Sequence, residues 1–451
     1  MLDSIFSSYF NAMIFLAFLT FIIGRHALKN PESDFVRKWS NKLRSGHGNM
    51  LFLMISISWA SAVSVFGSDI KSQIFGVQSL SWETLSFFST IYATIIVGIY
   101  HYIGQQRKER ENQARPPLKS IQLSATDIVD INGSLHTCIL DWQAILSKNT
   151  LYNECETFEK SLRSAKKMCL HSLLSIAESW DEKNNDNVIY RANVFNLAPS
   201  SGVMKEFERN DIVGPKPQNG GYSFNIRSVN DSPFFLFNDN WRSKLEKSDF
   251  ILVNEQDLSV SLPETTELQA GTPICMPYSE PTSPTDSEQK QPNIHGAPLA
   301  RELKRPVYIP DLKSQVTSTI SDLEISPRHR EHINDRFKNG LYKYYESDST
   351  RSILSIPIYK FDIGQPFSSL GTIDKPERDD KNIVCVVNLY ANKSHIFNNE
   401  DMANAYCDLV KPITHVFSIL VSIRLSLIEL QDMLAKPDYN CGVNDISKEV
   451  I

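Results

Sequence analysis

The stretch SIFSSYFNAMIFLAFLTFIIG, residues 4–24, decides how the chain is organised, because none of its 21 side chains is charged. A helix needs about 20 mostly apolar residues to cross the roughly 30 Å hydrocarbon layer of a membrane. Two later stretches, 45–68 and 84–106, also lack Asp, Glu, Lys and Arg. Buried helices of a soluble domain, which are the alternative, usually carry a polar face. We therefore predict three transmembrane helices, at about residues 4–24, 48–67 and 84–104.

The charges of the loops give these predicted spans an orientation. The first loop, 25–49, contains six basic residues: Arg25, Lys29, Arg37, Lys38, Lys42 and Arg44. The second loop, 67–83, contains only Lys71, whereas Arg107, Lys108 and Arg110 follow the third span. Because basic loops stay on the cytoplasmic side, we predict a multi-pass protein of the inner or plasma membrane. Its N-terminus is outside, its long C-terminal part is cytoplasmic, and its basic flank suits the anionic lipid of the bilayer.

The composition excludes several classes of protein. The 451 residues are 41% hydrophobic and 22% charged, with a formal net charge of -6. The chain is therefore neither fully disordered nor basic enough for a chain-wide nucleic-acid surface, and we expect no nucleic-acid partner. All seven cysteines lie beyond residue 137 and none forms a C-x-x-C pair. This pattern favours free thiols in a reducing compartment over disulfides or a zinc site.

The part of the chain beyond Arg115-Pro116-Pro117 has the pattern of an α+β domain. Apolar residues at helical spacing predict two amphipathic helices and one long closing helix, at residues 125–146, 151–180 and 400–434. Alternating and β-branched residues predict strands at 188–197, 250–262, 306–309, 352–359 and 383–390. We assign residues 107–185 to a basic juxtamembrane segment and helical connector, 186–435 to the α+β domain, and 436–451 to a polar tail.

Four fragments of this domain resemble a GAF domain, the small-ligand sensor module of many signalling proteins. They are 296–311, ending RPVYIPD, then RSILSIPI (351–358), IVCVVNL (383–389), and FNNED (397–401) before the closing helix. Here the core motif of the family falls on Asp311, Arg351, Ser352, Pro357 and Asn388. The resemblance implies that 351–358 and 383–389 are adjacent strands of a central antiparallel sheet flanked by helices. The closing helix would cover one face of the sheet, and the other face would form a ligand cavity. Insertions relative to the family fall at about 198–248 and 272–292.

A finer motif concerns the ligand. Asn392, Lys393, Phe397 and Asp401 resemble the N-K…F…D-E motif of GAF modules that bind cyclic nucleotides. In that family the Lys and Asp pair and hold the lid of the pocket, which implies a Lys393–Asp401 pair and a small-molecule ligand of nucleotide type. Met402 stands where the motif has Glu. The alternative is structural: the Asn ends a strand, the Phe anchors the helix and the Asp caps it.

Motifs for catalysis are missing from the sequence. It contains no Gly-rich phosphate loop, no G-x-S-x-G and no H-E-x-x-H, and no enzyme domain follows the GAF-like region, so we expect neither an enzyme nor a metal site. His329 and His332 are expected on a solvated, charged helix. No cofactor can be named.

The combined prediction is a membrane-anchored signalling protein, or effector. Its GAF-like domain senses a small ligand and signals through the membrane helices or through a partner. We expect a homo-oligomer or a partner signalling protein. The alternative is a passive membrane anchor whose GAF-like domain mediates protein–protein interaction or dimerisation without a ligand.

Overall fold

The structure is a computed structural model that divides into two compact units, Met1–Arg115 and Pro116–Ile451. The residues that it describes are 2–31, 33–44, 46–75, 78–113, 115–147, 152–181, 187–213, 224–264, 274–281, 289–347, 349–361 and 383–434. The predicted tail, 436–451, lies outside the described residues. Each unit is treated below by itself.

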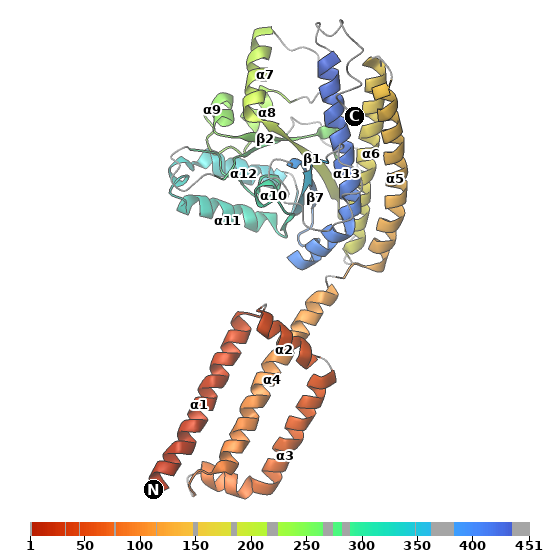
Figure 1. The fold of residues 1–451 in the computed structure, drawn as a ribbon. Coiled ribbons are helices and arrows are strands. Elements are labelled where there is room, and N and C mark those ends of the chain that lie inside the picture. Colours follow the sequence, from red (N-terminus) through yellow and green to blue (C-terminus); the bar gives the residue numbers. More distant parts are fainter. Residues whose placement is uncertain are drawn as a thin grey trace. The chain divides into compact units, whose positions relative to one another are not determined.

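In its described residues the first unit is helical, with α1 (Leu2–Lys29), α2 (Asp34–Arg44), α3 (Gly46–Ile74) and α4 (Trp82–Gln113) (Figure 1). Three segments of it, Tyr9–Lys29, Met50–Ile74 and Trp82–Glu109, are long and apolar enough to cross a membrane. A fourth such segment is Glu400–Gln431 in the second unit, but 61% of its apolar window is buried against the rest of the protein. For the other three segments this share is at most 17%. The fourth segment is thus a core helix, and the first three agree with the predicted spans.

Helix α2 lies inside the segment that the sequence predicts as the first loop. Its buried residues Val36, Ser40 and Leu43 share one face of the helix. Val36 and Leu43 pack in a cluster with residues of α1 and α4 that include Ala27 and Tyr100. Its four basic residues and short length give this segment no long apolar run, so its sequence has the pattern of a loop between two spans.

The second unit is built on one mixed α+β core. Its strands are β1 (Tyr190–Pro199), β2 (Phe250–Asn254), β3 (Val260–Leu262), β4 (Cys275–Tyr278), β5 (Val307–Ile309), β6 (Ser352–Tyr359) and β7 (Ile383–Ala391). They form one sheet in the order β4-β2-β1-β7-β6-β5, with β3 pairing β1, and every pair is antiparallel. The α+β class and the expected adjacency of 351–358 and 383–389 are therefore confirmed, since β6 pairs β7 from Ser352↔Ala391 to Tyr359↔Ile383.

One face of the sheet is covered by long helices: α5 (Leu118–Ser147), α6 (Tyr152–Trp180) and α13 (Glu400–Leu434) (Figure 1). Helix α13 has the bounds that its apolar pattern predicts. The buried stripe on it packs with inward side chains of β1, β6 and β7 in one cluster, which includes Val410, Ile413, Phe417, Leu420, Val194, Ile356 and Val387. Helices α5 and α6, predicted as a connector, belong to this same core through Ile131, Trp142, Leu173 and Trp180.

A buried ionic network fixes the helices to the sheet. Glu255, 3% exposed, follows β2 and accepts hydrogen bonds from Arg424 of α13 (2.7 Å) and Asn196 of β1 (2.8 Å). Lys166 of α6 lies 3.7 Å from the same carboxylate. Burial lowers the pKa of Lys166, although the charge of Glu255 opposes that shift. The network joins α6, α13 and β1 at one point and so fixes the positions of these three elements relative to one another.

The other face of the sheet is covered by short helices: α10 (Ala297–Leu303), α11 (Leu312–Ile325) and α12 (Asp335–Ser347). The predicted insertions are partly structured. The first contains α7 (Ser200–Val213), α8 (Ile226–Asp231) and α9 (Trp241–Glu246), and its Phe234 and Phe235 are buried. The second was expected to be a loop, but it contains the buried strand β4. The strand has only four residues, and the Pro and Ser content of the stretch is typical of a loop.

Candidate functional site

A row of three polar side chains crosses the middle of the sheet. Asn193 of β1 lies directly opposite Asn388 of β7, and Asn388 lies opposite Ser355 of β6. Alternation along the strands puts all three on the face away from α13, because their neighbours Val194, Leu389 and Leu354 belong to the cluster under that helix. We call Asn193, Asn388 and Ser355 the polar row. Asn388 is the one member that the GAF resemblance singles out.

The polar row is buried, yet each member keeps an unsatisfied atom. Asn193, Asn388 and Ser355 are 7%, 2% and 0% exposed. Within the described part of the chain, no hydrogen-bond partner meets Asn193 Oδ1, Asn388 Oδ1 or Ser355 Oγ. Leaving a buried polar atom unpaired costs about 1–3 kcal/mol. Three such atoms in one row make it a candidate binding site for a group that donates hydrogen bonds.

The segment that covers the polar row is anchored by a buried histidine. A Cβ built on Gly296 would lie 3.9 Å from Ser355 Oγ, so the backbone passes close to the row there. Gly296 has φ +81°, a conformation that favours glycine. The preceding residue, His295, contacts Tyr345 of α12 (2.6 Å) and Thr319 of α11 (3.4 Å). Burial lowers the pKa of His295 to about 4, so the imidazole is neutral at physiological pH.

A cationic residue shares the face of the polar row. Arg191 precedes Asn193 by two residues on β1, and side chains two residues apart in a strand point to the same face. Its Nε is buried and has no hydrogen-bond partner among the described residues. Two carboxamides, a hydroxyl and a guanidinium thus lie along one face of β1, β7 and β6.

The remaining predicted core-motif residues have structural roles. Asp311 caps α11, accepting hydrogen bonds from the Lys313 backbone N–H (3.2 Å) and the Ser314 hydroxyl (2.7 Å), and the bond from Ser314 lowers its pKa. Ser352 donates to the Lys393 carbonyl (2.6 Å). The Arg351 carbonyl accepts from the Leu312 N–H (2.8 Å). Pro357 lies opposite Val386 in the sheet.

Lys393 makes an ion pair that the sequence did not suggest. Its Nζ lies 2.6 Å from both carboxylate oxygens of Asp181, the residue directly after α6. The Tyr190 hydroxyl donates to the same carboxylate (2.8 Å), and burial raises the tyrosine pKa. Asp401, the expected partner, is exposed in the first turn of α13. The Lys393–Asp181 pair therefore joins the end of α6 to the β7–α13 connection.

Asn392 and Phe397 also bind the fold together. Asn392 Oδ1 accepts from the Ile189 N–H (2.9 Å) and so links the end of β7 to the start of β1. Phe397 is fully buried between Trp180, Tyr308 and Tyr406. The cap of α13 is Asn399, whose Oδ1 accepts from the Met402 N–H (2.8 Å), rather than Asp401. These contacts favour the structural alternative for Asn392 and Phe397.

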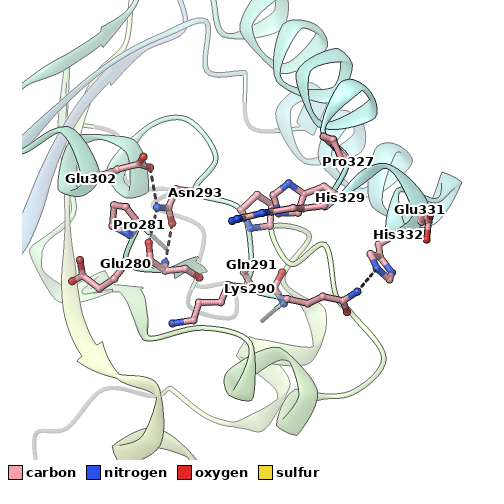
Figure 2. Close-up of a pocket in the computed structure, with 14 residues that line it drawn as sticks. Glu280, Pro281, Lys290, Gln291, Asn293, Glu302, Pro327, His329, Glu331 and His332 are labelled. Carbon is pink, nitrogen blue, oxygen red and sulfur yellow. Dashed lines mark hydrogen bonds between the residues drawn. The ribbon is translucent and has the colours of Figure 1, made fainter. Parts of the chain in front are cut away.

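A hollow of about 520 Å³ lies at the surface, and Figure 2 shows the residues around it. His329 and His332 both line it, although they lie at a turn and the short 3₁₀ helix η2 (Arg330–His332) rather than on the expected α-helix. Its polar groups largely pair with one another or with neighbours: Lys290 with Asp249 (2.9 Å), Asn293 with Glu302 (2.9 Å) and Gln289 with His332 (3.0 Å). Within the described residues, no group of three or more His, Cys, Asp or Glu could hold a metal ion. The polar row, with its unpaired atoms, is the stronger candidate site.

Sequence analysis missed Asn193, Ser355, His295 and Asp181. Alternation alone places Ser355 on the face of Ile353 and Pro357, and it places Asn193 on the face of Arg191. What the sequence could not supply is the register that aligns Asn193 with Asn388 and Ser355 across three strands. Comparison of the chain with family models, with curated proteins and with solved structures gave no match.

The Lys393–Asp181 pair yields a prediction about stability. Replacing Asp181 with Asn removes the charge of a buried carboxylate that binds both Lys393 and Tyr190, so the free energy of unfolding of the second unit should fall by roughly 2 kcal/mol. Asp401→Asn, the matched control on the predicted partner, should cost at most about 1 kcal/mol, because it alters only a helix-dipole interaction at the surface. Thermal unfolding followed with a thiol-reactive dye reports on this unit alone, since residues 1–137 contain no cysteine. A larger loss for Asp401→Asn would instead support the Lys393–Asp401 lid.

Proposed function

We propose that the protein is a membrane-anchored signalling protein whose GAF-like second unit senses a small molecule at the polar row. The observation that carries the proposal is the set of three buried, unpaired polar atoms on adjacent strands: Asn193 Oδ1, Asn388 Oδ1 and Ser355 Oγ. Two further features support a sensor of GAF type. The long closing helix covers one face of the sheet, and short helices cover the face that carries the row.

The chemistry of the row favours a ligand of nucleotide type. The two asparagine oxygens are acceptors and the serine hydroxyl can accept, so the ligand group opposite them carries N–H or O–H donors. The row itself has no charge, which suits an uncharged base edge. Arg191 on the same face supplies the bidentate donor that phosphate groups prefer. A cyclic nucleotide has both groups in one small molecule.

The first unit supplies the membrane anchor in this proposal. The positive-inside rule and the basic residues of α2 and of the end of α4 support an orientation in which these elements and the second unit are cytoplasmic and the α3–α4 connection is outside. Ligand binding shifts the equilibrium of the sensor only if the ligand prefers one of its states. The signal then passes to the membrane helices or to a partner.

Two serines of β6 provide a test of whether the polar row is a ligand site or only a structural feature. Ser355→Ala removes a hydroxyl without a partner, so the unliganded protein should keep its unfolding temperature or gain slightly. Ser352→Ala, the matched control, removes the hydrogen bond to Lys393 and should cost about 1 kcal/mol. With cyclic mono- and dinucleotides added to the full-length protein in mild detergent, the wild type and Ser352→Ala should be stabilised. A ligand at 100 times its dissociation constant adds about 2.7 kcal/mol, and Ser355→Ala should lose most of that gain.

Two outcomes of this experiment would contradict a nucleotide site at the polar row. One is an unchanged unfolding temperature of the wild type with every nucleotide tested. The other is an equal response of Ser355→Ala and Ser352→Ala, which would mean that the ligand binds elsewhere. The first result favours the passive anchor that acts by protein–protein contact.

The orientation is tested by cysteine labelling of intact cells with a membrane-impermeant maleimide. Ser79→Cys in the α3–α4 connection and Asn41→Cys in α2 introduce thiols at exposed positions. We expect Ser79→Cys to react at once and Asn41→Cys to react only after permeabilisation, because α2 is cytoplasmic. The reverse pattern would overturn the orientation and place the second unit outside.

A further inference from the structure

An exposed stripe of helix α5 has no charge, and this is unusual for a helix face in contact with water. Within the described part of the second unit, eight large apolar side chains are exposed, and five of them lie on α5: Leu118, Ile121, Val129, Leu140 and Leu146. Val129 is 67% exposed and Leu118 is 70% exposed. The opposite face of α5 carries the buried residues Ile131, Cys138 and Trp142. Helix α5 is therefore apolar on two sides, only one of which is packed.

Four of these five residues, all except Leu146, fall on a regular repeat. The α5 stripe consists of Leu118, Ile121, Ala125, Val129, Asn132, His136, Leu140 and Gln143, all of them exposed. Their spacing runs 3-4-4-3-4-4-3, which is an 11-residue repeat. Such a repeat has 3.67 residues per turn, close to the 3.6 of a straight helix, so the stripe stays on one side of the helix for about 38 Å. The four charged residues of α5, Lys119, Asp127, Asp130 and Asp141, all lie off the stripe.

We propose that the α5 stripe is the surface through which two copies of this chain form a parallel dimer. In a parallel, in-register pair each stripe residue meets its own counterpart, which would be unfavourable for charged residues and is tolerable for an uncharged stripe. Ala125 is small enough for close approach of the helices. The amides of Asn132 and Gln143 carry both donors and acceptors, so each can bond its own copy and fix the register.

The position of α5 in the chain favours a second copy over other occupants. It begins two residues after Pro116 and follows the last predicted span, so two copies anchored in one membrane would present α5 in the same direction; this step rests on the proposed function. A membrane surface is a poor occupant, because Asp127, Asp130 and Asp141 on the flanks would be repelled by anionic lipid. Helices that lie on membranes usually carry Lys and Arg instead.

Cysteine cross-linking of the full-length protein in its native membrane tests this surface. Six of the seven cysteines are described and all six are buried, so a Cys441→Ser background leaves no exposed described thiol. Val129→Cys lies in the middle of the stripe, and Asp130→Cys, its neighbour, is equally accessible but points about 100° away around the helix. We expect oxidation to convert most of Val129→Cys into a disulfide-linked dimer and to cross-link Asp130→Cys at least several-fold more slowly. Equal rates, or faster cross-linking at position 130, would overturn the proposal.

A charge variant provides the second test. Val129→Glu with Leu140→Glu puts like charges opposite each other in the dimer, while both positions are exposed in one copy, so folding should be retained. Native mass spectrometry in mild detergent should find dimers of the wild type and monomers of the double variant, with similar unfolding temperatures. A double variant that stays dimeric would overturn the α5 interface. Its response to nucleotides is measured separately, so failure of the dimer is distinguishable from failure of the ligand site.

Discussion

The packing of α13 and α6 against β1, β7 and β6 is the constraint on which the second unit depends. The apolar stripe of α13 covers one face of the three central strands, and the Glu255 network with Arg424, Lys166 and Asn196 fixes the helices in register with the sheet. Because buried charges are costly unless paired, this arrangement tolerates little sliding. One face of the sheet is thereby covered by helices, and the polar row lies on the other.

The same constraint explains where polarity is placed. On the face under α13, the central positions of β1, β7 and β6 are Val194, Val387 and Ile356, whereas the opposite face carries Asn193, Asn388 and Ser355 at its centre. A sheet that needed only to be stable would be apolar on both buried faces. The cover over the polar row is held by His295, which joins α11 to α12, and Lys393 joins the β7–α13 connection to Asp181 at the end of α6.

Much of the fold could be predicted from the sequence, because the spacing of apolar residues along a long segment indicates whether it is a helix or a strand. Residues 400–434 and 352–359 have the predicted bounds, and the three apolar stretches are helices. The prediction failed for short or mixed segments. Helix α2 is amphipathic but short and basic, so its sequence has the pattern of a loop, and β4 lies in a Pro- and Ser-rich stretch that is typical of a loop. The site was only partly predictable. The family motif singled out Asn388, but which residues lie beside it depends on the strand register. Lys393 pairs with Asp181, which is 212 positions away in the sequence.

The central claim is that the polar row holds a small molecule with hydrogen-bond donors. The most direct measurement is mass spectrometry of the small molecules released from the full-length protein purified in mild detergent, compared with Ser355→Ala and Ser352→Ala. We expect the wild type and Ser352→Ala to release one compound with a base-like group in similar amounts, and Ser355→Ala to release much less. Release of no compound by the wild type, or of equal amounts by all three proteins, would contradict a ligand site at the row.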